Sequence, residues 1–168
     1  LMLACGRGHV DVALALVDKG ADMNVQRSDG WTALMWACGR GHVDVALALV
    51  DKGADMNVQT SDDWTALMSA CDRGHVDVAL ALVDKGADMN VQRSDGWTAL
   101  MLACGRGHVD VALALVDKGA DMNVQNSDGW TALMLACDRG HVDVALALVD
   151  KGADVDLLAG GLELLDSA

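Results

Sequence analysis

Cysteine and histidine recur in this sequence at a spacing that could bind a metal ion. Three residues separate Cys38 from His42, and the same pair appears in each of five similar segments. Zinc requires about four ligands around one point. Neighbouring helices pack about 8 to 10 Å apart, so cysteines from successive segments cannot share an ion or form a disulfide without a large distortion. We therefore expect no metal site, and interpret each cysteine as a small buried hydrophobic residue.

Two further patterns are candidates for phosphate binding and for acid–base catalysis. Gly39 and Gly41 form a G-x-G, but a dinucleotide motif follows a strand and has a third glycine near the helix start, where Asp44 stands here. Asp44 and Asp51 lie seven residues apart on one predicted helix face. Both are expected to be solvated, and no cleft belongs to one segment alone. We expect no cofactor and no enzyme activity.

Each of these candidate groups recurs at a step of 33 residues, as the separation of Trp31 from Trp64 shows. A sustained period of this length is typical of stacked structural repeats. An active site needs one constellation distinct from its surroundings, whereas here every group is copied. The period therefore favours a repeated surface over a single catalytic site.

Each period contains signals for two helices and a loop. Thr32 can cap a helix from Ala33 to about Cys38, because its hydroxyl can accept a bond from a free N–H in the first turn. A second helix is predicted from about Val43 to Lys52, and Gly53 should end it. The polar segment that follows, 54–64, is predicted to be an extended connection.

The segments resemble ankyrin repeats: DGWTALM at 29–35, GH at 41–42 and GADMN at 53–57 are similar to that family's DGxTPLH, GH and GADVN. The resemblance runs from Leu1 to about Asp156. It implies an all-α fold, an ankyrin-like solenoid of stacked helix-turn-helix units with hairpin loops. The expected organisation is one array over 1–168, divided into partial repeat one (1–28), repeat two (29–61), repeat three (62–94), repeat four (95–127), repeat five (128–156) and a C-terminal cap or linker (157–168).

The sequence departs from the family pattern at three places. Ala33 and Met35 stand where the family has proline and histidine, so we expect looser corners between hairpin and helix. Asp63 replaces the glycine of the other hairpins, which makes repeat three the weakest hairpin. The C-terminal leucines could cover the last helix face, or could belong to a linker; they are Leu157, Leu158, Leu162, Leu164 and Leu165.

Composition restricts the partners. A formal charge of -13 and a pI near 4.4 oppose nucleic-acid binding, because the protein repels phosphates. The apolar runs are far shorter than the roughly 20 residues of a membrane-spanning helix.

The odd cysteine count predicts free thiols in a reducing compartment. We therefore expect an intracellular, cytoplasmic protein that is monomeric as an isolated array. Because the sequence begins within a repeat, we expect it to be part of a longer chain.

Two surfaces are predicted to bind partner proteins. The resemblance implies that the residue before each capping threonine projects from the hairpin toward the concave side, although each indole could instead pack on a neighbouring hairpin beneath Arg27 or Arg93. This tryptophan row is Trp31, Trp64, Trp97 and Trp130. The inner face of the first helix adds variable positions and constant arginines: Trp36, Ser69, Leu102, Leu135, Asp72, Asp138, Arg40, Arg73, Arg106 and Arg139.

A second row occupies the outer helix at a position where the family usually has a charged residue: Leu14, Leu47, Leu80, Leu113 and Leu146. A partner could cover it, or a small rotation of the helix could bury it. The favoured function is a non-catalytic protein-interaction scaffold that uses the hairpin tips and the concave face. The alternative is a regulatory or targeting arm of a larger enzyme such as a kinase or an acyltransferase. Because the repeats are nearly identical, discrimination must come from the few differing positions.

Overall fold

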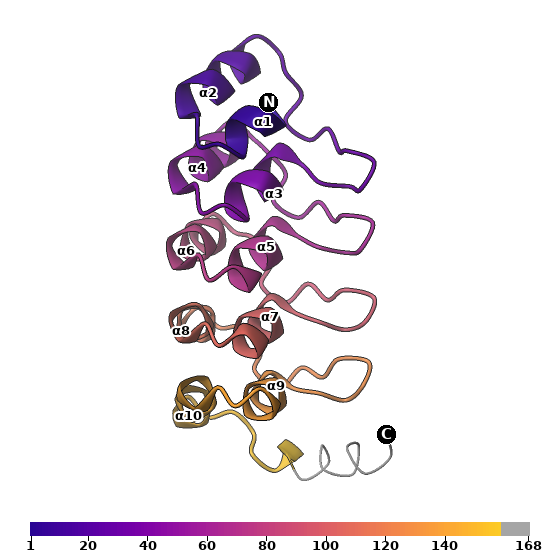
Figure 1. The fold of residues 1–168 in the computed structure, drawn as a ribbon, viewed down its shortest axis with the longest axis vertical. Helices are drawn as coiled ribbons and strands as arrows, with labels where there is room; N and C mark the ends of the chain where they lie inside the picture. Colours follow the sequence, from indigo (N-terminus) through magenta and orange to yellow (C-terminus); the bar gives the residue numbers. More distant parts are fainter. Residues whose placement is uncertain (159–168) are drawn as a thin grey trace. The chain divides into compact units, whose positions relative to one another are not determined.

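The computed structural model describes residues 1–158, which form ten helices and no strand. The chain divides into two compact units, unit 1 (Leu1–Asp88) and unit 2 (Met89–Ala168). Figure 1 labels the helices of both units. The helices of unit 1 are α1 (Met2–Cys5), α2 (Val10–Asp18), α3 (Ala33–Cys38), α4 (Val43–Asp51), α5 (Ala66–Asp72) and α6 (Val76–Asp84). Those of unit 2 are α7 (Ala99–Arg106), α8 (Val109–Asp117), α9 (Ala132–Asp138) and α10 (Val142–Asp150). The predicted all-α class is confirmed.

The first helix of each complete repeat begins directly after a capping threonine, as predicted. At α3 the N–H of Met35 donates to Oγ1 of Thr32 (3.3 Å), and the N–H of Thr32 donates to the sulfur of Met35 (3.5 Å). Thr131 and Met134 form the same two bonds at α9. Methionine sulfur is a weak acceptor. It nevertheless satisfies a backbone donor at the corner where the family motif has histidine.

The second helix has the sequence VDVALALVD in every repeat and the same length each time. α4 ends at Asp51, one residue before the predicted end, with Lys52 as its C-cap. Gly53 follows with a φ of 96°, a left-handed conformation that glycine adopts without a steric penalty. The helix buries the side chains of Val45, Ala46 and Leu49.

The helices of each unit form two layers. In unit 1, α3 packs against α1 and α5, and α4 packs against α2 and α6. In unit 2, α9 packs against α7, and α10 packs against α8. The core lies between the layers, where residues such as Leu34 and Leu49 are fully buried. Each such leucine contributes about 1.5 to 3 kcal/mol through removal from water.

Polar contacts recur between neighbouring repeats within each unit. Nζ of Lys52 lies 2.8 Å from Oδ1 of Asp18, Nζ of Lys85 lies 2.6 Å from Oδ1 of Asp51, and Lys151 pairs with Asp117 in the same way. The loops are joined by a backbone N–H that donates to an asparagine Oδ1 one repeat earlier. These bonds link Asp55 to Asn24, Asp88 to Asn57, Asp121 to Asn90 and Asp154 to Asn123.

The histidine before α4, α6 and α10 packs against a glycine of the preceding repeat. A Cβ atom on Gly8 would lie 2.9 Å from Nδ1 of His42, and one on Gly107 would lie 2.7 Å from Nδ1 of His141. Both glycines have left-handed backbones, with φ of 75° and 79°. Nε2 of His141 also lies 3.3 Å from the carbonyl oxygen of Gly105. His141 thus joins the loops of two neighbouring repeats.

Asp63 is the one non-glycine residue in the described chain with a positive φ, at 61°. Its equivalents Gly30, Gly96 and Gly129 have φ between 79° and 82°. At Gly30 a Cβ would also lie 2.6 Å from Cα of Thr60, so this hairpin requires glycine for space as well as for conformation. Asp63 thus has the left-handed conformation of the glycines whose position it occupies.

The structure places part of the C-terminal leucine cluster. Leu157 and Leu158 follow α10 and are half-buried. The other three leucines named for a cap, Leu162, Leu164 and Leu165, lie outside the described residues, as do the remaining positions from 159 onward. None of the helices in residues 1–158 combines the length and apolar character that a membrane crossing needs.

Candidate protein-binding surface

The four hairpin tryptophans share one local geometry. Each precedes a capping threonine and is half-buried: Trp31 and Trp64 in unit 1, Trp97 and Trp130 in unit 2. A backbone hydrogen bond closes each hairpin. In the first of them the N–H of Arg27 donates to the carbonyl oxygen of Trp31 (3.1 Å). The N–H of Trp31 donates to Oδ1 of Asp29 (3.1 Å). The indoles are therefore held on ordered hairpins with part of each ring accessible.

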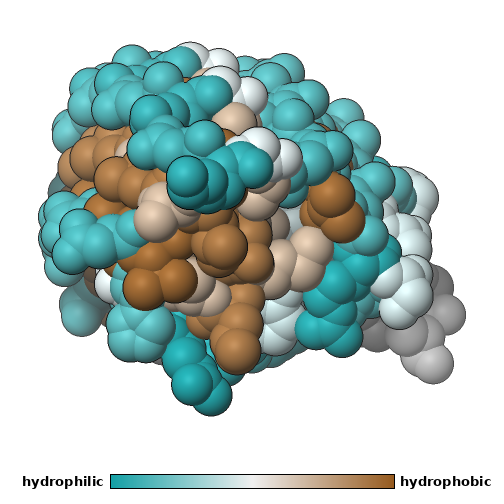
Figure 2. All heavy atoms as spheres, turned by 90° about the horizontal axis from the view of Figure 1, so that it is seen from above, coloured by the Kyte–Doolittle hydropathy of each residue, from teal (hydrophilic) through white to brown (hydrophobic). Residues whose placement is uncertain are grey.

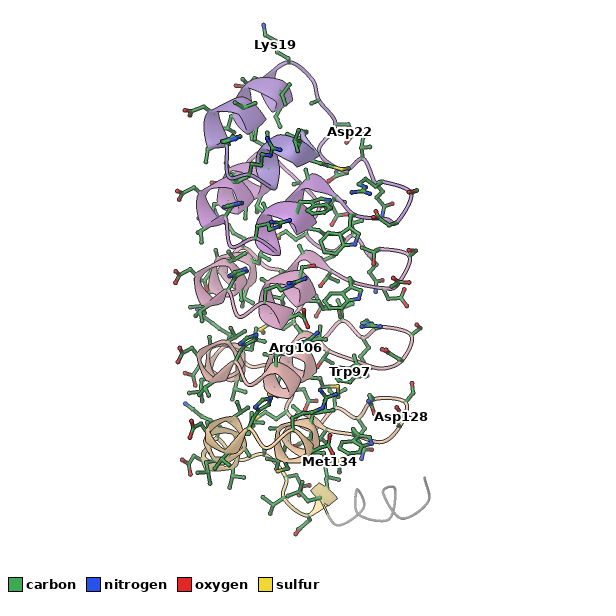
Figure 3. All side chains as sticks on the ribbon, in the orientation of Figure 1. Lys19, Asp22, Trp97, Arg106, Asp128 and Met134 are labelled. Atoms are coloured by element: carbon green, nitrogen blue, oxygen red, sulfur yellow. The ribbon has the colours of Figure 1, made fainter. Side chains whose placement is uncertain are left out.

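The inner surface of these indoles contacts a position that alternates between glycine and aspartate. A Cβ on Gly39 would lie 3.9 Å from the ring of Trp31, and one on Gly105 would lie 3.7 Å from the ring of Trp97 (Figure 3). In repeats three and five the same position holds Asp72 and Asp138. The carboxylates of Asp72 and Asp138 lie 3.6 and 3.5 Å from Nε of the arginine that follows each. Glycine at this position thus leaves room for the indole ring, whereas aspartate at the same position adds a negative charge.

Repeat two carries a second tryptophan, and it forms a cluster with arginine. The ring centroids of Trp31 and Trp36 lie 5.3 Å apart at an interplanar angle of 49°. Cζ of Arg27 lies 5.6 Å from the centroid of Trp36, and Cζ of Arg40 lies 6.0 Å from it. Both distances fit a cation–π interaction. We call these four residues the tryptophan–arginine cluster; the stacking predicted for Arg27 on a hairpin indole occurs on Trp36 instead.

A hollow of about 450 Å³ lies beside the cluster. It is lined by three residues of the cluster, Arg27, Trp36 and Arg40, together with Met2, Leu3, Gly6 and Arg7. Three arginines therefore meet at one apolar hollow on a protein whose formal charge is -13. The indole N–H of Trp36 is buried and has no hydrogen-bond partner in the described part of the chain.

Sequence reasoning missed two contributors to this hollow. Leu3 occupies in repeat one the position of Trp36, and Arg7 occupies the position of Arg40. The 33-residue period was enough to identify both, because it places their side chains one repeat away from the variable residue. Met2, the equivalent of Met35, is only half-buried and also reaches the hollow.

The variable positions equivalent to Trp36 are not part of an open face, which corrects the prediction made for them. Ser69, Leu102 and Leu135 are exposed by only 3%, 7% and 5%. The hydroxyl of Ser69 donates to the carbonyl oxygen of Thr65 (3.0 Å) within its own helix. These three side chains face the neighbouring helices, and only the larger Trp36 extends far enough to remain half-buried.

The constant arginines do lie at the surface. Arg40, Arg73, Arg106 and Arg139 are all exposed. Asp72 is the more enclosed of the two variable acids, with 10% of its side chain exposed against 42% for Asp138. Repeats two and four have glycine in place of this acid, Gly39 beside Arg40 and Gly105 beside Arg106.

The other chemical candidates have clear structural settings. No group of three or more His, Cys, Asp or Glu side chains capable of holding a metal occurs within residues 1–158. Asp44 and Asp51 are exposed, and Asp51 pairs with Lys85.

Four cysteines are buried, as expected, whereas Cys137 is exposed, which corrects the prediction for repeat five. In unit 2 a later helix pair covers Cys104, but none covers Cys137 among the described residues.

The outer leucine row is largely packed against its neighbours. Leu14, Leu47, Leu80 and Leu113 are half-buried, and Leu146 is 60% exposed. The packing of α4 on both α2 and α6 accounts for the partial cover of Leu47. The row is therefore not a uniformly open surface.

Comparison with known families agrees with these helix pairs. A family model described as ankyrin repeats, three copies long, matches residues 1–93 and again residues 86–159. The two matches together span residues 1–159, nearly the whole sequence. Ankyrin repeats are generally protein–protein interaction modules, and the family is typically non-catalytic. With its capped helix pairs, its glycine-terminated second helices and its hairpin loops, the chain belongs to the ankyrin-repeat family.

Proposed function

We propose that this chain is a non-catalytic protein-interaction scaffold that binds its partner through the hairpin tryptophans and the adjacent arginine-bearing helix face. The tryptophan–arginine cluster of repeat two is the anchor. The observation that carries this proposal is the placement of Arg27 and Arg40 over Trp36 beside a hollow of about 450 Å³. Trp and Arg are the residue types that most often dominate the binding energy of protein interfaces.

The chemistry of the cluster favours an acidic partner segment with an apolar side chain. A guanidinium binds a carboxylate through paired hydrogen bonds. Arg7, Arg27 and Arg40 surround the hollow, and Leu3 and Trp36 provide an apolar wall. Arg27 also lies 3.6 Å from Asp29, a long and exposed contact that a partner carboxylate can replace. A basic partner would meet this cationic point unfavourably.

The cluster also distinguishes repeat two from the other, nearly identical repeats, so it can fix where a partner binds along the array. A partner bound only to the tryptophan row could shift by one repeat and find almost the same contacts. Trp36 occurs once, and its equivalents in repeats three to five are buried. Asp63 and Asp72 add differences in repeat three. The partner is therefore expected to be anchored at repeat two, or to be repetitive itself.

Free thiols fit the expected location. Cys5, Cys38 and Cys104 are buried and form no disulfide with a described residue. An intracellular, reducing compartment keeps such thiols reduced. We therefore place the interaction inside the cell, in the cytoplasm.

Binding to a panel of synthetic peptides tests the proposal. The peptides are acidic, neutral or basic, each with and without a large apolar side chain, and fluorescence anisotropy measures their affinity. The unmodified chain should prefer the acidic, apolar peptides. Trp36→Leu installs the residue found at positions 102 and 135 and should weaken this binding by about tenfold or more.

Trp130→Leu is the matched control, because it removes an indole of the same row from a hairpin that has Asn126 where repeat two has Arg27. It should change the affinity for these short peptides by less than about twofold, because the proposal anchors them at the cluster of repeat two. Equal losses from the two variants, no preference for acidic peptides, or no binding of any peptide would each refute the cluster as anchor. Circular dichroism verifies that both variants keep the helical fold.

A further inference from the structure

Each hairpin tip contains a serine followed by an aspartate. The sequence Ser-Asp-Gly-Trp occurs in repeats two, four and five, where its aspartate is Asp29, Asp95 and Asp128. In repeat three the equivalent Asp62 is followed by Asp63 instead of glycine. Figure 2 shows hydrophilic residues around the apolar centre of one face, and the serine of every hairpin tip is likewise exposed to water.

An aspartate followed by glycine can undergo a covalent reaction that needs no enzyme. The backbone nitrogen of the glycine attacks the carbon of the protonated side-chain carboxyl group. A C–N bond forms, the carboxyl group loses OH, the nitrogen loses H, and water leaves. Water then opens either carbonyl of the resulting five-membered imide and yields aspartate or isoaspartate. Glycine favours the attack because it has no Cβ beside the nitrogen.

In repeats two and four the aspartate side chain is held by its neighbours. Oδ1 of Asp29 accepts a hydrogen bond from the N–H of Trp31 (3.1 Å), and Oδ2 lies 3.6 Å from the guanidinium of Arg27. Asp95 makes the same two contacts, at 3.2 and 3.0 Å, with the equivalent tryptophan and arginine. Both contacts favour the charged carboxylate, which is not the reactive form. They must also break before the carboxyl carbon can face the glycine nitrogen.

In repeat five the equivalent side chain is released, because Asn126 replaces the arginine. Oδ1 of Asn126 accepts from the N–H of Trp130 (2.8 Å) and from the N–H of Asp128 (3.1 Å). The tryptophan N–H is therefore already bonded, and this position has no guanidinium. The side chain of Asp128 is exposed and makes no hydrogen bond or ion pair within residues 1–158. Figure 3 labels it on its hairpin in unit 2.

Repeat three separates the two requirements of the reaction. Oγ1 of Thr60 accepts from the N–H of Trp64 (3.0 Å) and from the N–H of Asp62 (3.3 Å). The side chain of Asp62 is therefore also free of bonds to described residues, but the next residue, Asp63, has a Cβ that hinders the attack. Repeats two and four have the glycine without the free side chain. Among these four hairpins, only the one with Asp128 has both.

We propose that Asp128 is a site of spontaneous isomerisation, at which the folded chain forms an imide with Gly129 and then isoaspartate. The N–H of Gly129 donates to the carbonyl oxygen of Asn126 (2.9 Å). Gly30 and Gly96 donate in the same way at 2.9 and 2.8 Å, so the side chains and not the backbone bonds distinguish the sites. The inference rests on these hairpin contacts and is independent of the proposed binding function.

The reaction changes the hairpin that holds Trp130. Imide formation removes the N–H of Gly129 and with it a bond that closes the turn. Isoaspartate adds one methylene to the main chain between residues 128 and 129. The bond from the N–H of Asn126 to the carbonyl oxygen of Trp130 (2.9 Å) then no longer has its original register. We therefore expect this hairpin to loosen as the protein ages, while the other three hairpins stay intact.

Peptide mapping of the folded chain after incubation tests the proposal. The incubation is at physiological temperature and mildly acidic pH, because the protonated carboxyl group is the form that reacts. Trypsin releases each hairpin in a different peptide: 28–40, 53–73, 94–106 and 119–139. An isoaspartyl peptide keeps its mass but elutes separately, and electron-transfer fragmentation locates the isomer. Peptide 119–139 should gain an isomer at Asp128 about fivefold or more faster than the other three, as expected where a charged group lacks its hydrogen bonds.

The unfolded chain is the first control. Asp29, Asp95 and Asp128 have the same residues directly before and after them. In concentrated guanidinium these three aspartates should therefore isomerise at rates within about twofold of one another. Asp62 should stay unchanged there, because it lacks the following glycine.

Three variants exchange the features of the hairpins. Asn126→Arg installs the residue of repeats two and four and should slow the reaction at Asp128 by about fivefold or more. Arg93→Asn should release Asp95 and raise its rate by about the same factor, in a hairpin between two complete repeats. Gly129→Asp installs the sequence of repeat three and should abolish the isomer. Circular dichroism verifies that each variant keeps the helical fold.

Three results would overturn the proposal. The first is the absence of an isomer at Asp128 in the folded chain. The second is an equal rate at Asp29, Asp95 and Asp128 in the folded chain, since the hairpin contacts would then give no protection. The third is an unchanged rate at Asp95 in folded Arg93→Asn or at Asp128 in folded Asn126→Arg, because the arginine would then not control the reaction.

Discussion

Thr32 and Met35 bond each other reciprocally at the start of α3, through an N–H to oxygen bond of 3.3 Å and an N–H to sulfur bond of 3.5 Å. The methionine sulfur thereby accepts a hydrogen bond from a backbone N–H at the corner between hairpin and helix. The looseness expected from the absence of proline and histidine is thus opposed by a specific pair of bonds. Both residues are almost fully buried, so loss of either bond leaves a polar group without water.

Replacement of Thr32 by alanine should lower the free energy of unfolding by about 1 to 2 kcal/mol, because a buried first-turn N–H loses its acceptor. Thr32→Ser keeps the hydroxyl and should recover most of this loss. Urea unfolding followed by circular dichroism measures the difference. Equal stability of the alanine and serine variants would show that the cap does not stabilise α3.

Replacement of Asp63 by glycine should raise the free energy of unfolding by about 1 kcal/mol, because a φ of 61° costs less for glycine. The reciprocal change, Gly30→Ala, should lower it by more than about 1 kcal/mol, since the new Cβ would also lie 2.6 Å from Cα of Thr60. Urea unfolding of both variants and of the unmodified chain shows whether each change raises or lowers the free energy of unfolding. A destabilised Asp63→Gly variant would contradict strain at this hairpin.

Alkylation should distinguish Cys137 from the other thiols. Burial raises the pKa of Cys104 to about 12 and also raises the pKa of Cys5 and of Cys38. The thiolate is the reactive form, so at pH 8 to 9, below the raised pKa, these thiols stay protonated and enclosed. Mass spectrometry after brief iodoacetamide treatment should find label on Cys137 alone.

In guanidinium all five cysteines should react, and a Cys137→Ser variant should remain unlabelled while folded. Labelling of Cys104 at the rate of Cys137 in the folded chain would mean that the helix pair over Cys104 opens readily. The same comparison at pH 7 and pH 9 should leave Cys104 unreacted at both pH values, because its raised pKa keeps the thiol protonated.

The ion pair of Lys52 with Asp18 should contribute about 0.2 to 1 kcal/mol, as exposed pairs do. Lys52→Ala should lower the free energy of unfolding by this amount at low salt and by less at 1 M salt, where the screening length is about 3 Å. Lys19→Ala is the matched control, since Lys19 has no acidic partner in residues 1–158, and it should have little effect in dilute solution. Equal losses from the two variants would indicate helix propensity as the cause.

Much of the fold follows from the sequence because each signal is repeated. Thr32 and Gly53 mark a helix start and a helix end, and five repeats present the pattern in the same order. Every helix predicted in the complete repeats formed within about two residues of its expected bounds, and the largest difference is at α7, which extends to Arg106 instead of ending near Cys104. The extension ends at Gly107, the first left-handed residue after it.

The candidate site was harder to predict, for a physical reason. Helical spacing places Ser69 and Leu102 on a face relative to their own helix, but their burial depends on what the neighbouring helices cover. Stacking of Arg27 on Trp36 joins a hairpin to a helix of the next repeat, which no local pattern encodes. Val12 and Val45 are the extreme case: they lie in identical nine-residue segments, and only their surroundings differ.

The bonds between neighbouring repeats within each unit join residues 31 to 36 positions apart, from Asn24 with Asp55 to Gly105 with His141. Each of these bonds therefore joins a repeat only to its immediate neighbour. A gene encoding such a chain can therefore gain or lose whole 33-residue modules by unequal recombination, and each new junction reuses bonding partners that the protein already has.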